Sequence, residues 1–134
     1  MSIRATTKFK ITNWDEKPYD VVAGQPKLTR ASVTQAYVGD IEGEGKVEHL
    51  MVYGDGASAN YVTLERVVGR IGGKSGSYVT QGSGTFEGDT AKGTFFVVPG
   101  SGTGELAGLR GTGSFIAVGG QPDTQVVTLE YEFS

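Results

Sequence analysis

The sequence contains no cysteine and a single histidine, His49, and these absences exclude several kinds of chemistry. Without cysteine the chain can form no disulfide framework, thiolate nucleophile, iron–sulfur cluster or cysteine zinc site. With one histidine it can form no site that needs several histidine ligands, and any histidine-based triad would have to use His49. We therefore expect no metal and no cofactor.

The chain also lacks a basic surplus and any long hydrophobic run. Twelve Lys and Arg stand against fifteen Asp and Glu, for a formal net charge of −3, whereas proteins that neutralise phosphates carry an excess of basic residues. The longest aliphatic or aromatic run covers only residues 95–98, far below the ~18 residues of a membrane-spanning helix. Residues 1–4 show no apolar segment of the kind found in secretory signals. We expect a cytoplasmic protein that binds neither nucleic acid nor a membrane.

Glycine, by contrast, is abundant, with 22 copies in 134 residues against only four prolines. The glycines follow no G-x-y period, which argues against a collagen-like chain. Hydrophobic residues make up 37% of the sequence, which is enough to form a core and argues against disorder. The length is typical of one domain, which we expect to span residues 1–134.

The dominant period of the sequence is two, the period of half-buried strands. Ile3, Ala5 and Thr7 alternate with charged or polar neighbours, and the last residues of the chain alternate in the same way. Glycine-rich breaks such as Gly54-Asp55-Gly56 and Gly72-Gly73 suit tight turns. The pattern predicts strands near 3–12, 28–40, 46–54, 60–71, 75–86, 91–99, 111–119 and 127–133. One helical turn is expected near 105–109.

Eight strands joined mostly by short turns predict an all-β fold, a small eight-stranded antiparallel β-barrel. Closing the sheet removes its exposed edges. An eight-stranded barrel has an interior that is either packed solid or able to hold one small ligand. A two-sheet sandwich is the alternative closed arrangement, and we favour the barrel.

An internal repeat supports the barrel. Residues 83–94 (SGTFEGDTAKGT) match residues 101–112 (SGTGELAGLRGT) at an offset of 18. An even offset keeps equivalent side chains on the same face of a sheet. We interpret each unit as a strand end, a connection and the start of the next strand. Independent turn chemistry in two glycine-rich segments is the alternative.

Two segments resemble known ligand-binding loops, but both lack a required feature. Residues 69–75 end in G-K-S, yet position 68 is Val where a phosphate loop needs Gly, and a strand follows instead of a helix. Residues 40–45 are rich in carboxylates, yet the bidentate ligand of a calcium loop would fall on Met51. We expect neither nucleotide binding nor a calcium loop.

Two carboxylates, Glu48 and Glu65, lie on neighbouring predicted strands and could in principle face one cleft, as hydrolysis with paired acids requires. Glu48 shares its face with Lys46, however, and Glu65 is followed directly by Arg66. We therefore interpret both as members of ion pairs on the outside of the barrel.

His49 is the most informative single residue. It shares strand parity with Val47, Met51 and Tyr53, so it faces an apolar interior if that side of the strand points inward. There it could shuttle a proton or bond a ligand, because burial readily moves the pKa of histidine. A structural histidine bonded in the wall is the alternative. The tyrosines could equally be ordinary strand residues. Polar groups that could join the same cavity are Tyr37, Tyr61, Tyr78, Tyr131 and Gln81.

Residues 99–111 (PGSGTGELAGLRG) form a distinctive segment. Further characteristic segments are Trp14-Asp15-Glu16, Pro18-Tyr19, Lys27-Leu28-Thr29-Arg30, Leu64-Glu65-Arg66-Val67 and Ser83-Gly84-Thr85-Phe86. On these segments nearly the whole chain resembles an uncharacterised bacterial family of small one-domain proteins with no assigned activity. The fold of that family is similar to the barrel of allene oxide cyclase. Family members often carry His after Gln before S-G-T-F, whereas this chain has Gln81-Gly82.

The resemblance implies a barrel with a largely apolar cavity that is open at one end. Related barrels guide the cyclisation of a reactive intermediate by shape and a few polar contacts, without a cofactor. No cyclase active-site motif matches this chain, so the resemblance transfers no catalytic residue. If the missing histidine is functional in relatives, this chain has lost it. If that histidine only fills space, Gly82 enlarges the cavity.

Our first hypothesis is a barrel that binds a small, mostly apolar organic molecule and promotes its cyclisation or isomerisation. The candidate catalytic residues are His49 and Tyr53, and the candidate ligand-binding residues are Tyr37, Tyr78, Glu65 and Gln81. Our second hypothesis is a barrel whose interior is filled, acting as a homodimeric interaction module through an outer sheet face. The volume of the interior distinguishes the two hypotheses.

Overall fold

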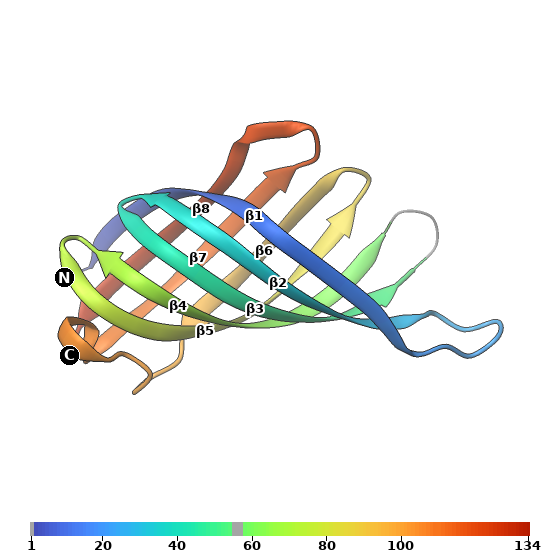
Figure 1. The fold of residues 1–134 in the computed structure, drawn as a ribbon, viewed down its shortest axis with the longest axis horizontal. Helices are drawn as coiled ribbons and strands as arrows, with labels where there is room; N and C mark the ends of the chain where they lie inside the picture. Colours follow the sequence, from blue (N-terminus) through green and yellow to red (C-terminus); the bar gives the residue numbers. More distant parts are fainter. Residues whose placement is uncertain (1, 55–57) are drawn as a thin grey trace.

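The computed structural model describes residues 2–54 and 58–134, with the side chains of residues 122–124 left out. The expected turn at Gly54-Asp55-Gly56 lies mostly outside these residues. The chain forms eight strands and one short 3-10 turn (Figure 1). These elements are β1 (Ile3–Asp20), β2 (Leu28–Gly39), β3 (Ile41–Tyr53), β4 (Ala59–Ile71), β5 (Lys74–Glu87), β6 (Thr90–Val97), η1 (Gly104–Leu106), β7 (Leu109–Val118) and β8 (Gln121–Phe133).

Each strand pairs antiparallel with the next one, and β8 pairs back with β1, so the sheet closes on itself. The closing ladder runs from Ile3 opposite Tyr131 to Lys8 opposite Val126. The expected eight-stranded antiparallel barrel is therefore confirmed over the alternative sandwich. No helical segment within the described residues is long and apolar enough to span a membrane.

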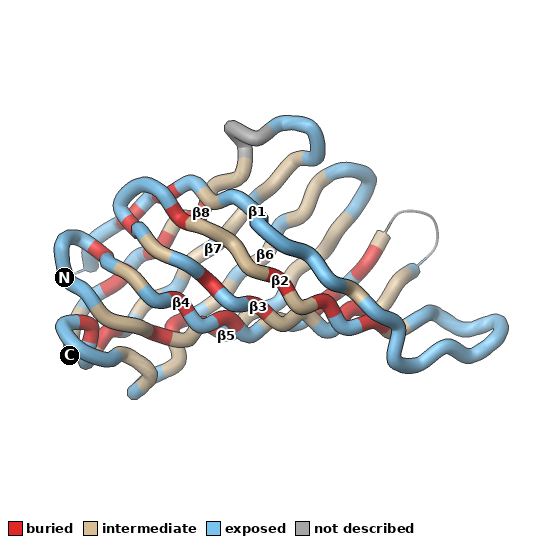
Figure 2. The backbone as a smooth tube through the Cα atoms, in the orientation of Figure 1, coloured by how far each residue is buried: buried red, intermediate tan, exposed pale blue. Residues whose placement is uncertain are grey.

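Strand β1 is longer than its alternating pattern predicted. It leaves β8 after Lys8 and continues along β2 as far as Asp20, opposite Leu28. Two register irregularities, at residues 11–13 and 18–20, interrupt this second half. The connection between β1 and β2, residues 21–27, projects from the barrel and is exposed (Figures 1 and 2). The residues of the second half of β1 do not alternate regularly, although Ile11 and Trp14 still line the interior of the barrel.

One end of the barrel contains a tight glycine turn and the short segment η1. Gly72 and Gly73, with φ of 57° and 84°, make the two-residue turn between β4 and β5, a turn that needs positive φ at both positions. At the same end, the backbone N–H of Thr103 donates to the carbonyl of Ser77, and η1 buries Leu106 completely. The expected single helical turn is thus present one residue early, and it closes this end of the barrel.

Equivalent residues in the two copies of the 18-residue repeat lie on the same face of the sheet, but the two copies do not have the same secondary structure throughout. Lys92 and Arg110 are both exposed, and Gly93 and Gly111 both lie on the opposite, inner face. The first copy begins inside β5, whereas residues 101–103 of the second copy lie outside any strand. The interpretation of the repeat as two equivalent units therefore holds for the strand starts and fails for the strand end.

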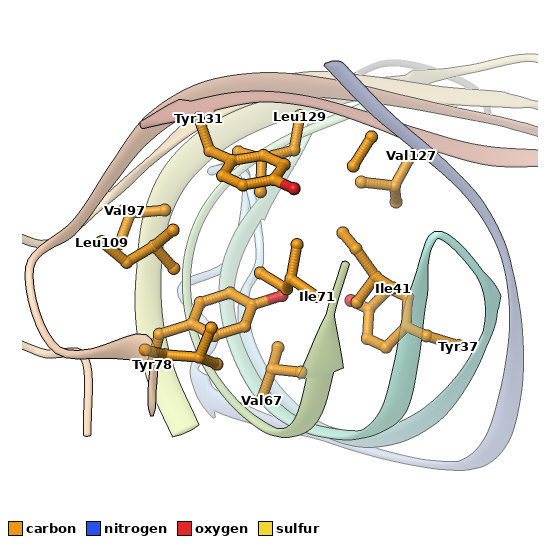
Figure 3. Close-up of a cluster of buried hydrophobic side chains, with 12 residues drawn as sticks. Tyr37, Ile41, Val67, Ile71, Tyr78, Val97, Leu109, Val127, Leu129 and Tyr131 are labelled. Atoms are coloured by element: carbon orange, nitrogen blue, oxygen red, sulfur yellow. The ribbon is translucent and has the colours of Figure 1, made fainter. Parts of the chain in front are cut away.

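Buried side chains form two core clusters inside the barrel. The larger one lies towards the end that η1 closes and includes Tyr37, Tyr78 and Tyr131 (Figure 3). Inward glycines let rings approach the wall: a Cβ on Gly113 would lie 2.5 Å from the ring of Phe95 and 2.4 Å from a backbone carbonyl oxygen. Such positions accept only glycine. They make space for large aromatic rings inside a narrow barrel.

Candidate functional site

The interior of the barrel contains a cavity of about 140 Å³ between the two core clusters. An apolar cavity of about 150 Å³ is known to hold benzene, so this one suits a molecule of roughly one ring. The interior is therefore not filled. Among the lining residues are eight aromatic side chains: Phe9, Trp14, Tyr37, Tyr61, Tyr78, Phe86, Phe95 and Phe115. The polar lining residues are Gln35, His49, Thr63, Glu65, Thr80, Ser83 and Thr94.

Glu65 lies on the inner face of β4, with only 9% of the residue exposed. Its Oε2 accepts a hydrogen bond of 2.5 Å from the Tyr37 hydroxyl and one of 2.7 Å from Nε2 of Gln35. The expectation of an outer ion pair for Glu65 is wrong. Glu65 shares strand parity with the buried Tyr61 and Val67, and that parity turns its side chain into the barrel.

The carboxyl group of Glu65 has no Lys or Arg neighbour inside the barrel. All twelve Lys and Arg residues of the chain are exposed. Burial raises the pKa of Glu65, and the hydrogen bonds from Tyr37 and Gln35 only partly oppose the rise. Burial and the nearby carboxyl group in turn raise the pKa values of Tyr37 and Tyr78. The hydroxyl groups of these two tyrosines point toward each other across the interior (Figure 3).

The second carboxyl oxygen of Glu65 opens into the cavity. Both hydrogen bonds of this side chain end on Oε2, and none of the described residues bonds Oε1. Yet no buried side-chain nitrogen or oxygen atom of the described residues lacks a partner. Oε1 must therefore be accessible, and Glu65 lines the cavity. A bound molecule could reach this atom.

His49 lies on the inner face of β3 and also lines the cavity. Its Nδ1 is 2.7 Å from the hydroxyl oxygen of Thr63, directly opposite on β4. Its ring lies 5.7 Å from the Trp14 ring and 5.1 Å from the Tyr61 ring. Burial lowers the pKa of His49 to about 4, so the imidazole is neutral near pH 7. By the same accessibility argument, Nε2 is open to a ligand.

Tyr53, unlike His49, does not line the cavity. Its hydroxyl donates a short hydrogen bond to Oε2 of Glu16, which also accepts a bond from Thr29, while Trp14 donates to Oε1. Burial raises the pKa of Glu16, but these three hydrogen bonds together with the charge of Lys27 outweigh it and hold the pKa below its usual value. Glu16 belongs to the second half of β1, on the His49 side of the cavity.

Two predicted positions lie on the outer surface. Gln81 is exposed and does not share the cavity, because it alternates with the inward Thr80 and Gly82 on β5. Glu48 pairs on the outside with Arg30, whose Nη2 lies 2.6 Å away, as expected. At Gly82 a Cβ would lie 2.2 Å from the Thr94 carbonyl oxygen. This backbone therefore accepts only glycine at position 82.

The arrangement combines neutral hydrogen-bonding groups with one buried carboxyl group in a mostly apolar space. Among the described residues, no three His, Asp or Glu side chains gather closely enough to hold a metal ion. The sequence interpretation missed two contributors, Gln35 and Gly45. Gln35 has the same parity as Tyr37 and could have been found from it. Gly45 matters because the side chains of Tyr37 on β2 and Glu65 on β4 approach each other across β3 at this position. No local sequence pattern reveals that approach.

A model for a protein family of unknown function, DUF3224, matches residues 5–131. The chain belongs to the DUF3224 family. Its barrel is similar to the crystal structure of a DUF3224 protein of unknown function from Shewanella oneidensis MR-1, with a TM-score of 0.83 and 29% sequence identity. The match covers 100% of this chain and 98% of that one. No curated protein matches. Membership of a family of unknown function is thus confirmed, and the likeness to allene oxide cyclase stays a prediction.

Proposed function

We propose that this DUF3224 protein binds a small, mostly apolar organic molecule inside its barrel. The observation that carries the proposal is the cavity of about 140 Å³ with eight aromatic lining residues. Ligand sites are typically apolar hollows with a few convergent polar groups. Oε1 of Glu65 and Nε2 of His49 are such groups. The volume limits the ligand to about one ring with a short substituent.

Mass spectrometry of the purified protein under native and denaturing conditions tests the proposal first. A small molecule that is released on denaturation would support it. Benzyl alcohol then serves as a neutral one-ring probe, with Trp14 as the reporter, because Trp14 is the single tryptophan and lines the cavity. We expect saturable changes in its fluorescence.

A matched pair of substitutions makes this test specific to the cavity. Ala117 lines the cavity, so Ala117→Phe should fill the space and abolish binding of benzyl alcohol. Ala107 is exposed beyond η1, so Ala107→Phe makes the same chemical change outside the cavity and should leave binding intact. Equal binding of benzyl alcohol to Ala117→Phe and to the wild-type protein would overturn the proposal, and so would a failure of every one-ring probe, neutral or charged, to bind the wild-type protein.

The catalytic form of this proposal is cyclisation or isomerisation of the bound molecule without a cofactor. A neutral histidine and a carboxyl group with a raised pKa suit proton transfer near neutral pH. In this role His49 and Glu65 would exchange protons with the ligand. Tyr37 and Tyr78 would hold the ligand or the Glu65 carboxyl group in place. With the compound released from the protein as substrate, His49→Gln and Glu65→Gln should abolish turnover and retain binding. Full turnover in both variants would contradict this catalytic role of His49 and Glu65.

A second candidate function, self-association through the outer surface, rests on a different observation. Leu50 and Val62 lie opposite each other on β3 and β4 and are 46% and 54% exposed. With Leu64 and Phe96 they form an apolar patch in a shallow hollow of the outer face. The adjacent Arg30–Glu48 ion pair offers one charge of each sign, so a second copy related by a two-fold axis could pair with it.

Light scattering over a dilution series tests this second candidate. We expect a dimer in the wild-type protein and a monomer after Leu64→Glu, which places a charge in the patch. Val38→Glu is the matched control, because Val38 is also exposed and does not line the hollow. A wild-type monomer at all concentrations would contradict self-association.

A further inference from the structure

We propose that the ligand of the cavity is a small organic cation, a protonated amine or ammonium group on a one-ring body, with its charge paired to Glu65. The inference rests on the proposed binding function and names the chemical class of the ligand. Three features of the interior support it: the charge of Glu65, the direction of its free oxygen and the aromatic walls.

The first feature is an acidic group without a counter-charge. Glu65 is the one buried carboxylic acid among the described residues, and every Lys and Arg of the chain is exposed. His49, which lines the same cavity, is neutral near pH 7. The partners of Glu65, Tyr37 and Gln35, are neutral donors. An ionised carboxylate in an apolar interior is costly unless a cation joins it. The protein supplies no such cation, so a positively charged ligand would complete the pair.

The second feature is the way in which the hydrogen bonds divide between the two oxygens. Tyr37 and Gln35 both donate to Oε2, and two donors on one oxygen suit an ionised carboxylate. These bonds hold the carboxyl group in one orientation. Oε1 is left facing the cavity and able to accept a hydrogen bond. A protonated amine supplies both the N–H donor and the charge that this oxygen lacks.

The third feature is the aromatic surround. The cavity is lined by eight aromatic residues, including Phe9, whose ring centroid lies 6.3 Å from that of Tyr37. Tyr61 and Phe115 form a second pair, 6.4 Å apart, farther along the cavity. Aromatic faces attract organic cations, and cages of such rings are a recurrent way of binding ammonium groups. A carboxylate beside these rings favours a cation over a neutral molecule of the same shape.

A ligand that only accepts hydrogen bonds is the main competitor for this cavity. It would fit if Glu65 remained protonated, with the acid proton on Oε1 as the donor. A protonated Glu65 can still accept two hydrogen bonds on Oε2. In that form, however, the carboxyl group carries no charge with which to attract a ligand. The two alternatives predict opposite preferences between ligands of equal size.

The experiment compares benzylamine, benzyl alcohol and benzaldehyde, which have the same ring and nearly the same size. Binding is followed by Trp14 fluorescence and by calorimetry at neutral pH. We expect the wild-type protein to bind benzylamine at least tenfold more tightly than benzyl alcohol. In Glu65→Gln, which keeps the shape and removes the charge, this preference should disappear while benzyl alcohol still binds. Glu48→Gln removes an exposed carboxylate and should behave as wild type.

The outcomes separate this inference from the function on which it rests. Binding of benzyl alcohol or benzaldehyde as tightly as benzylamine would overturn the cation and leave the binding function standing. A preference for benzylamine that survives Glu65→Gln would also overturn it. If none of the three probes binds, both the binding function and the cation are wrong.

Discussion

The hydroxyl of Tyr37 on β2 reaches across β3 to donate a 2.5 Å hydrogen bond to Oε2 of Glu65 on β4. The strand between them carries Gly45 at this point, and a Cβ there would lie 2.0 Å from the same carboxyl oxygen. A bond between alternate strands is possible because the intervening residue has no side chain. Gly45 thus determines where the buried carboxyl group can lie.

Gly45→Ala should displace the Glu65 carboxyl group and break its hydrogen bonds with Tyr37 and Gln35. We expect the free energy of unfolding, measured with a chemical denaturant, to fall by about 1–3 kcal/mol, the cost of disrupting buried hydrogen bonds. Gly119→Ala is the control, since a Cβ there would make only ordinary contact, 3.4 Å from its nearest neighbour. The Gly45 effect should shrink in a Glu65→Ala background. An equal effect in both backgrounds would contradict the steric explanation.

Tyr37→Phe should destabilise the barrel without changing its shape. It removes the donor with the shorter bond to Glu65 Oε2 and leaves a buried carboxyl group with Gln35 alone, so the unfolding free energy should fall by about 1–3 kcal/mol. Tyr131→Phe is the matched control. Tyr131 is also a buried tyrosine of the larger cluster, but its hydroxyl makes no hydrogen bond with the described residues. Similar losses in both variants would mean that the Tyr37 bond contributes no special stability.

Glu65→Gln should become more stable than the wild-type protein as the pH rises. Burial raises the folded-state pKa of Glu65 above its usual value of 4.5, so the folded protein holds this proton more tightly than the unfolded chain. The contribution of Glu65 to stability is therefore complete below pH 4.5 and is lost as the pH rises through the folded pKa, so the wild-type protein loses stability relative to Glu65→Gln. Denaturant titrations from pH 4 to pH 8 measure the difference between the two proteins.

Glu48→Gln provides the opposite slope. Hydrogen bonds from Ser32 and Arg30 hold the pKa of Glu48 below 4.5, so this carboxylate stabilises the fold above pH 4.5, and its contribution is lost as the pH falls. The advantage of the wild-type protein over Glu48→Gln should thus be greatest at neutral pH. If the two Gln variants showed the same dependence on pH, Glu65 would not be buried.

His49→Gln should reduce the loss of stability in mild acid. Burial lowers the folded-state pKa of His49 from 6.5 to about 4, so the unfolded chain takes up this proton first. The contribution of neutral His49 to the free energy of unfolding is complete above pH 6.5 and is lost as the pH falls to about 4. Relative to the variant, the wild-type protein should lose at most roughly 3 kcal/mol over that range. Parallel pH profiles would contradict a buried, neutral histidine.

Alternation in the sequence was sufficient to predict the strands and the closed barrel. It did not establish which side of β3 faces inward; the unbroken register of β3 with both β2 and β4 in the structure does. His49 accordingly lies on the cavity with Met51. The second half of β1 was not predicted, because its strand structure depends on pairing with β2 and not on burial.

The face of Glu65 was predicted wrongly for a physical reason. Both faces of β4 carry apolar residues, with Tyr61 and Val67 inside and Val62 and Leu64 outside, so alternation does not reveal the inner face. The adjacent Arg66 made an outer ion pair the simpler interpretation. Gln81 was misplaced in the same way, since β5 alternates small and polar residues on both faces. Only the closed sheet fixes these orientations.

The closing ladder between β1 and β8 has a consequence for how the chain reaches this structure. Every other strand pair joins neighbours in the sequence, whereas Arg4 and Glu130, which bond at this ladder, are 126 positions apart. Pairing of such distant segments is slow because the chain entropy must be lost first. A circularly permuted chain, with its present ends joined and a new break at residues 21–27, would keep all eight ladders. In that chain the β1–β8 pair would become a local hairpin, and the last strands to meet would be β1 and β2.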